Sequence, residues 1–179
     1  NVTLSNAISG AGNLSTVGSN VTTLTGAATY TGTTNVTNGS IIFTNNVAPA
    51  TSGFAGNGSV TIQPTSGSSF SSDLASNYSF ANTLTGLTLG SSTNTANISI
   101  DSATSIAGNV AIYGGNVAIN NALTATSSGI IRLQATSGAV TQGANGNITT
   151  TGLALLGGDA TLTNANNVTT LAAESMGNL

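Results

Sequence analysis

The sequence predicts an all-β fold: a right-handed parallel β-helix (β-solenoid) that spans residues 1–179 as one segment, with an irregular excursion near residues 64–82. Three observations predict it. Short runs of alternating apolar and polar residues are separated by Gly and Asn, which is typical of strands joined by tight turns. Short phrases recur along the chain, and repeated strand-and-turn units usually stack into a solenoid. Aromatic and charged residues are rare, which favours a thin, layered, aliphatic core over a compact globule.

The first 48 residues hold the clearest repeats. Val2 and Leu4 alternate with polar neighbours, and residues 41–43 form a short apolar run, so both are expected to be strands. The triplet Asn-Val-Thr begins at Asn1, Asn20 and Asn35.

This part of the chain resembles the passenger-associated repeat of bacterial autotransporters, a β-helix unit. The matching positions are Gly10, Gly12, Leu14, Gly18, Leu24, Gly26, Tyr30, Gly32, Thr34, Val36 and Gly39. Four positions depart from the pattern, where Thr16 replaces Lys, Asn20 replaces Gly, Thr22 replaces Leu and Ala28 replaces Asn. The resemblance implies the β-helix fold, but no role that depends on the missing Lys.

Residues 49–92 are less regular. Residues 60–62 form a short strand pattern that ends before Pro64, and Leu84, Leu87 and Leu89 return to strand-like alternation. Between them lie four spaced aromatic and aliphatic residues: Phe70, Leu74, Tyr78 and Phe80. Their spacing is compatible with a short helix, but Ser is a weak helix former. An excursion, either a loop or an added strand, is therefore expected to pack its aromatic rings on the solenoid.

The second half of the chain, residues 93–179, carries strand patterns without any capped helical pattern. The predicted strands are residues 97–100, 109–113, 116–120, 130–135, 139–142, 147–156, 159–163 and 167–173. We expect the alternating residues Val110, Ile112, Val117 and Ile119 to face the core. No helix longer than two turns is expected anywhere.

Residues 113–135 and 138–173 resemble the repeat region of filamentous haemagglutinin-type proteins, large two-partner-secreted adhesins of Gram-negative bacteria. The amino-terminal secretion domain of that family carries Asn-Pro motifs, and this chain has no Asn-Pro. The resemblance therefore implies a piece of the shaft, not the export signal.

The physical requirements of a β-helix fit these residues. Each coil turns short strands around a core one layer thick, and the next coil stacks about 4.8 Å away. Inward positions favour stacked aliphatic residues, turns favour Gly and Asn, and Asn side chains can form hydrogen-bonded ladders along the axis. At about 20 residues a coil, the chain predicts roughly nine coils and a rod of ~40 Å. The main alternative architecture is a two-sheet β-sandwich.

Bulk composition excludes several classes of function. With one basic residue and a net charge of −3, the chain lacks the basic cluster that nucleic-acid binding needs. Without Cys there is no disulfide or thiolate metal site, and no apolar run approaches a membrane helix. The chain begins with Asn and shows no signal peptide. We expect a segment of a larger exported protein, located outside the cell or on the bacterial cell surface.

No catalytic, cofactor-binding or metal-binding residues are predicted, so the chain is not expected to be an enzyme. Polysaccharide-cleaving β-helices need clustered carboxylates, whereas Asp73 and Asp101 are 28 positions apart and the chain has no His. The triplet Gly157-Gly158-Asp159 lacks the tandem copies of a calcium-binding repeat and is interpreted as a tight turn.

The remaining residues that could bind a ligand or carry a modification each have a purely structural explanation as well. Arg132 alternates with apolar neighbours and is expected to face solvent, with pairing to a carboxylate as a second possibility. Tyr30, Tyr78 and Tyr113 are either ligand-contacting or simply packed. Asn-x-Ser/Thr triplets are candidate glycosylation sites or a product of composition, and they include those that begin at Asn1, Asn13, Asn20, Asn35, Asn57, Asn77, Asn97, Asn147 and Asn167.

The expected function is that of a structural or adhesive segment of a secreted bacterial surface protein, acting as a rigid shaft or adhesin repeat. The expected partner is a host or neighbouring-cell receptor or glycan of unknown identity, with end-to-end self-association as a further possibility. Alternatives are a self-assembling extracellular filament or matrix protein, an ice-binding protein that would need a regular Thr array, and a polysaccharide-active β-helix.

Overall fold

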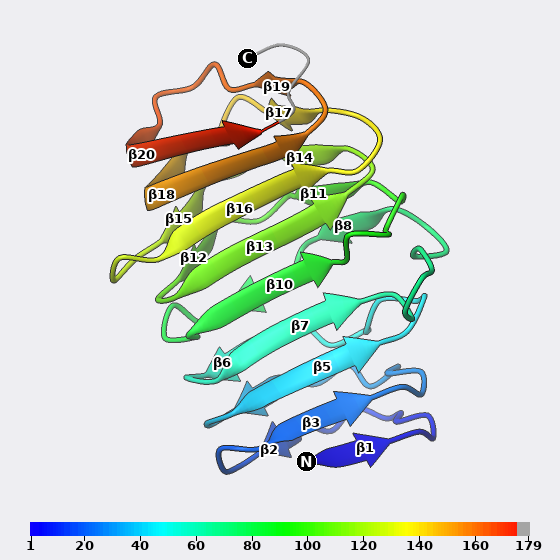
Figure 1. Cartoon of the computed structure of the whole chain (residues 1–179). Coiled ribbons are helices and arrows are strands. Elements are labelled where there is room, and N and C mark those ends of the chain that lie inside the picture. Colours follow the sequence, from blue (N-terminus) through cyan, green and yellow to red (C-terminus); the bar gives the residue numbers. More distant parts are fainter. Residues whose placement is uncertain (175–179) are drawn as a thin grey trace.

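The computed structural model describes residues 1–174, which form strands and turns without any helix (Figure 1). All strand pairings of the described residues are parallel. This excludes the antiparallel sheets of a β-sandwich and confirms the parallel β-helix. The front strands of Figure 1 run left to right while the coils rise toward the C-terminal end, which makes the solenoid right-handed.

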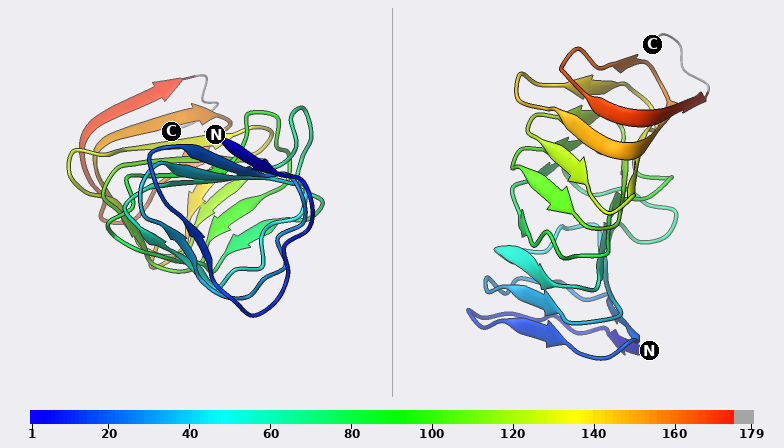
Figure 2. Two further views of the ribbon diagram at one scale, coloured as in Figure 1. Left: turned by 90° about the horizontal axis from the view of Figure 1, so that it is seen from below. Right: turned by 90° about the vertical axis from the view of Figure 1, so that its left-hand side faces the viewer.

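One face of the solenoid, the long face, receives a strand from every coil. Its members are β1 (Val2–Leu4), β3 (Val21–Leu24), β5 (Ser40–Thr44), β7 (Ser59–Gln63), β10 (Gly86–Gly90), β13 (Asn109–Gly114), β16 (Ile130–Ala135) and the later halves of β18 (Ile148–Gly157) and β20 (Asn167–Glu174). These nine strands correspond to the roughly nine coils that the length predicts. Figure 2 shows the coils end-on and from the side, with β1 and β20 at opposite ends of the stack.

Two further faces complete the coils, and the second of the three faces has strands only from β8 onward. The second face holds β8 (Leu74–Ser76), β11 (Ile98–Ile100), β14 (Val117–Ile119), β17 (Val140–Gln142) and β19 (Ala160–Thr161). The third face holds β2 (Leu14–Thr16), β4 (Thr34–Val36), β6 (Gly53–Gly56), β9 (Ser79–Phe80), β12 (Thr104–Ile106), β15 (Leu123–Ala125) and the first half of β18. β12 and β15 are missing from the strands that the sequence predicts.

The core consists of inward residues stacked from coil to coil. On the long face, one inward column runs Val2, Thr22, Ile41, Val60, Leu87, Val110, Ile131, Leu153, Leu171. The second column runs Leu4, Leu24, Phe43, Ile62, Leu89, Ile112, Leu133, Leu155, Ala173. Val110, Ile112, Val117 and Ile119 are all buried, so the predicted inside-outside register is confirmed.

The coils differ in length, and the longest one contains the predicted excursion. Val60 pairs with Leu87, 27 positions later, whereas Ile41 pairs with Val60 after only 19. The irregular part is shorter than residues 64–82, because two stretches of that range form the regular strands β8 and β9. Residues 64–73 make up the loop itself, and its Phe70 side chain is buried against the solenoid.

A buried Asn fixes this loop to the next coil. Asn94 accepts hydrogen bonds from the Ser69 hydroxyl (2.8 Å) and the Phe70 backbone N–H (3.2 Å). Its amide donates to the backbone carbonyls of Ala96 (3.0 Å) and Tyr113 (2.9 Å). Since all of its polar atoms have partners, Asn94 can be fully buried without a desolvation penalty for an unpaired group.

Candidate functional site

Asp73 belongs to a turn ladder. Its carboxylate accepts hydrogen bonds from the backbone N–H of Asn97 (2.9 Å) and from the Asn97 side-chain amide (3.0 Å). Asn97 in turn accepts from the backbone N–H of Asn116 (2.9 Å), and Asn116 accepts from the backbone N–H of Ala139 (2.9 Å). This is the axial side-chain ladder that the Asn-rich turns predict.

Asp101 stabilises the opposite end of the same face. It accepts hydrogen bonds from the Ser99 hydroxyl and the Asn120 side-chain amide, both at 2.7 Å. Asp73 precedes β8 and Asp101 follows β11, and these strands pair in register, so the carboxylates lie at opposite strand ends. That arrangement does not provide an acid and a base on one scissile bond.

The described residues contain no group of three or more His, Cys, Asp or Glu side chains that could hold a metal ion. Gly157 has a φ of 90° and leads through Gly158 into β19, so the Gly-Gly-Asp triplet forms the predicted tight turn. Among residues 1–174 there is no helix that is long and apolar enough to cross a membrane.

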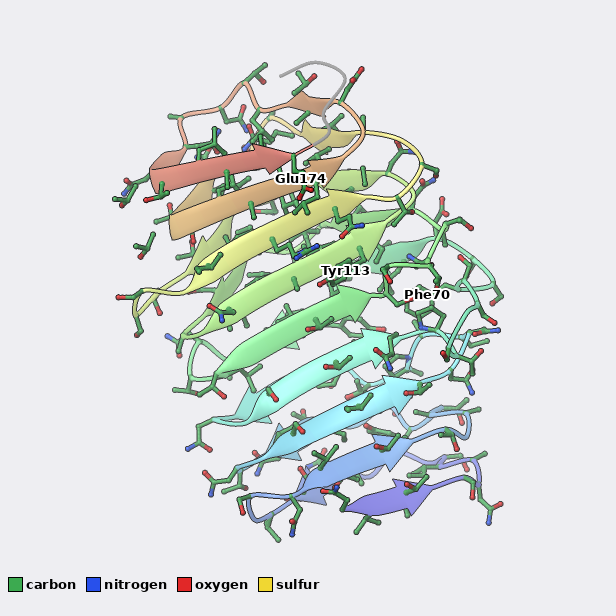
Figure 3. All side chains as sticks on the ribbon, in the orientation of Figure 1. Phe70, Tyr113 and Glu174 are labelled. Atoms are coloured by element: carbon green, nitrogen blue, oxygen red, sulfur yellow. The ribbon has the colours of Figure 1, made fainter. Side chains whose placement is uncertain are left out.

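The single cation of the chain lies on the outward side of the long face. Arg132 projects from β16, and its guanidinium carbon lies 5.6 Å from the centre of the Tyr113 ring, within the range of a cation–π contact. Its Nη2 donates to Oε1 of Gln134 (3.1 Å), while its buried Nε has no hydrogen-bond partner. The structure thus confirms the outward direction of Arg132. Figure 3 labels Tyr113 in the middle of this face and Glu174 near its C-terminal end.

The other two tyrosines are packed. Tyr30 is buried, and its hydroxyl is hydrogen-bonded to Thr34 (2.5 Å). Burial raises the pKa of Tyr30, and hydrogen bonds from Thr34 and Thr51 oppose that shift. The Tyr78 hydroxyl donates to the Pro49 carbonyl (2.8 Å), and burial raises the pKa of Tyr78 to about 12, with the nearby Tyr30 adding to the shift.

The outward surface is otherwise made of small polar and apolar groups. The Asn residues of the Asn-x-Ser/Thr triplets are exposed, and their modification stays a prediction. The central outward column of the long face does not repeat one residue type. It runs Thr3, Thr23, Ile42, Thr61, Thr88, Ala111, Arg132, Ala154, Ala172.

A hollow with mainly apolar lining residues lies at the C-terminal end of the described stack. A volume of about 340 Å³ is lined by Leu153, Leu162, Asn166, Val168, Thr169 and Leu171. At the opposite end, a hollow of about 260 Å³ is lined by residues 3–8, which include the partly buried Leu4 and Ile8. Both hollows are open ends of the same core. The candidate functional surfaces are therefore these two ends and the patch around Arg132.

No protein-family model, curated protein or solved structure matches this chain. The assignment of the β-solenoid fold therefore rests on the strand pairing of the described residues.

Sequence reasoning found some of these features and missed others. Alternation places Gln134 on the same side of β16 as Arg132, so their contact has a signal in the sequence. Tyr113 lies on the preceding coil, and only the register between coils brings it to Arg132. Asn94 has no signal that separates it from the many other Asn residues, because its partners Ser69 and Phe70 are more than 20 positions away.

Proposed function

We propose that this chain is a rigid shaft segment of a secreted bacterial surface protein, and that it holds other parts of that protein away from the cell. The observation that carries the proposal is the unbroken column of inward residues on the long face, which continues through all nine coils. A one-layer core with pairing on every coil resists bending, because bending would break backbone hydrogen bonds and separate packed residues.

The chemistry of the described residues also supports a structural role. Asp73 and Asp101 accept hydrogen bonds at turns, and two of the hollows with apolar lining residues are open coil ends. The bacterial and secreted parts of the proposal come from the two sequence resemblances, together with a composition that is rich in Asn, Thr and Ser, poor in charged residues and without Cys.

Single-molecule energy transfer can test the shaft. The natural chain has no Cys, so dyes can be attached at Thr3→Cys and Ala172→Cys, which occupy the two ends of one outward column. Eight steps between nine coils predict a separation of about 38 Å. We expect one narrow distribution, unlike the broad distribution of a Gly/Ser linker of equal length. A broad or denaturant-sensitive distribution well below the unfolding midpoint would contradict a rigid shaft.

The patch of Tyr113, Arg132 and Gln134 favours a second candidate function, an adhesin repeat. An Arg over an aromatic ring, with a neighbouring amide, offers an apolar platform and charged donors to a glycan that bears a carboxylate or sulfate. Beads coated with the chain would be tested for adherence to cells and to anionic glycans. Adherence that Arg132→Gln abolishes and the exposed-site control Asn145→Gln keeps would support this role. Beads that adhere neither to cells nor to anionic glycans would contradict the adhesin role, and the shaft would be the one remaining candidate function.

A further inference from the structure

Two identical Asn-Gly-Ser triplets lie in register on neighbouring coils. Residues 38–40 lead into β5 and residues 57–59 lead into β7, and Ser40 pairs with Ser59. A third Asn-Gly pair, residues 145–146, lies in the turn before β18. The Asn side of each pair is exposed. The chain therefore presents one reactive dipeptide in three structural settings.

The chemistry of an Asn-Gly pair depends on the backbone nitrogen of the Gly. Because Gly has no Cβ to hinder the approach, its nitrogen can attack the side-chain Cγ of the preceding Asn. A bond forms between nitrogen and Cγ, and the side-chain nitrogen takes up the Gly proton through solvent and leaves as ammonia. Water then opens the resulting cyclic imide at either carbonyl, which yields aspartate or isoaspartate. A hydrogen bond from the Gly N–H opposes this attack, since the nitrogen must first leave its acceptor.

In two of the three settings the Gly N–H is held by a backbone acceptor. The Gly58 N–H donates to the Val36 carbonyl of the preceding coil (2.9 Å). The Gly146 N–H donates to the Gly143 carbonyl of its own turn (3.0 Å), and Gly146 is also buried. Both turns must therefore open locally before the nitrogen can react.

The third setting leaves the nitrogen free. Within residues 1–174, neither the Gly39 N–H nor the Asn38 side chain makes a hydrogen bond. The backbone beside them is nevertheless held on both sides. The Ser40 N–H donates to the Asn20 carbonyl of the preceding coil (3.2 Å), and the Gly39 carbonyl accepts from the Ser59 N–H of the next coil (3.0 Å). The stacking of the coils thus fixes this turn without occupying the attacking nitrogen.

We propose that Asn38 is a site of spontaneous deamidation, at which the Gly39 nitrogen forms the imide and water opens it. The product is a carboxylate in the turn before β5, where residues 1–72 otherwise contain no charged side chain. An isoaspartate product also routes the main chain through the Cβ atom of residue 38. It thereby lengthens a turn that is tied to the coils on both sides. This inference does not depend on the proposed shaft or adhesin role.

Peptide mapping by mass spectrometry tests the site. The folded full chain is incubated at neutral pH, and the conversion of amide to acid is followed at each Asn-Gly pair. Asn38 should react about tenfold faster than Asn57, because the hydrogen bond of the Gly58 N–H must open first. The same chain in urea is the control for sequence context. There the two sites should react at similar rates, since they stand in the same triplet.

Substitution checks the assignment. In Asn38→Gln the longer side chain would have to close a larger ring, so this variant should lose the acidic form that ion-exchange chromatography separates from the parent. The matched variant Asn57→Gln should keep that form. Equal rates at Asn38 and Asn57 in the folded chain would overturn the proposal. So would a faster reaction at Asn145, or an acidic form that accumulates in Asn38→Gln at the parent's rate.

Discussion

The N-terminal coils, residues 1–63, and the C-terminal coils, residues 86–174, achieve the same stacking in different ways. In the C-terminal coils all three faces have strands, and the interior is mostly aliphatic, with Asn94, Thr104 and Thr150 as its buried polar residues. In the N-terminal coils the second face has no strand and only one isolated bridge, between Ile8 and Ala28. A buried polar cluster of Tyr30, Thr34 and Thr51 lies in this part of the interior.

Aromatic rings bridge the transition between the two regions. Phe54 contacts Phe43, Tyr78 and Phe80, with ring centres 5.3–5.9 Å apart. The loop of residues 64–73 lies between Phe54 and Tyr78 along the chain, and β8 after it is the first strand of the second face. The comparison teaches that a solenoid tolerates a change of cross-section where bulky rings fill the mismatch and an inserted loop absorbs the extra residues.

The largest expected effect concerns the aliphatic interior of the C-terminal coils. Val117→Asp should lower the free energy of unfolding by several kcal/mol, because a buried carboxylate would have no partner there. Burial raises the pKa of such a carboxyl above its unfolded value, so the loss should shrink as pH falls through that pKa. Urea denaturation of Val117→Asp and of the outward-facing control Ala118→Asp measures this. Equal stability of the two variants would reverse the assigned register.

The next effect concerns the aromatic transition. Phe54→Ala should cost about 3–5 kcal/mol, since the ring is buried and three other rings would lose a packing partner. Phe80→Ala removes a partly buried ring from the same cluster and should cost less. Thermal and urea unfolding of the two variants give the comparison. A Phe54→Ala variant within 1 kcal/mol of the parent would mean that the rings are not needed to join the two kinds of coil.

A smaller loss of unfolding free energy is expected at Asn94, which holds the loop of residues 64–73 to the next coil. Asn94→Ala should cost about 1–3 kcal/mol, because the Phe70 N–H and two backbone carbonyls would lose a buried partner. Proteolysis within residues 64–73 should accelerate in this variant, whereas Asn145→Ala, in an exposed turn, should behave like the parent. If cleavage is unchanged in Asn94→Ala, then the packing of Phe70 alone holds the loop.

The sequence predicts the local features of this fold better than its long-range ones. Alternation places Val110 and Val117 correctly because the period of two is a property of the strand alone. β12 and β15 escape prediction, although β11 and β14 are equally short, because Thr104 and Ala125 occupy inward positions that β11 and β14 fill with larger aliphatic residues. The coil lengths vary, so the pairing of Tyr113 with Gln134, and hence the patch around Arg132, depends on a register that no local pattern encodes.

The smallest expected effect is a pH dependence confined to the N-terminal coils and the transition. The pKa of Tyr78 is raised to about 12, first because burial disfavours the phenolate and second because Tyr30 is near. The unfolded chain releases this proton near pH 10. The folded state therefore binds more protons than the unfolded state between about pH 10 and about 12. The contribution of this proton to the free energy of unfolding is complete below pH 10 and is lost as pH rises through this window.

Tyr78→Phe separates this effect from the packing of the ring. The variant keeps the aromatic contacts of Tyr78 and loses its hydrogen bond to the Pro49 carbonyl, so it should be slightly less stable at neutral pH. Above pH 10 the free energy of unfolding of this variant should fall less steeply with pH than that of the parent, because one fewer proton distinguishes the folded from the unfolded state. The slope that remains should include the contribution of Tyr30, whose pKa is also raised. Urea midpoints across this pH range, with tyrosinate absorbance in parallel, measure both. A variant with the parent's full slope would show that Tyr78 ionises as readily folded as unfolded, and that the aromatic transition is open to water.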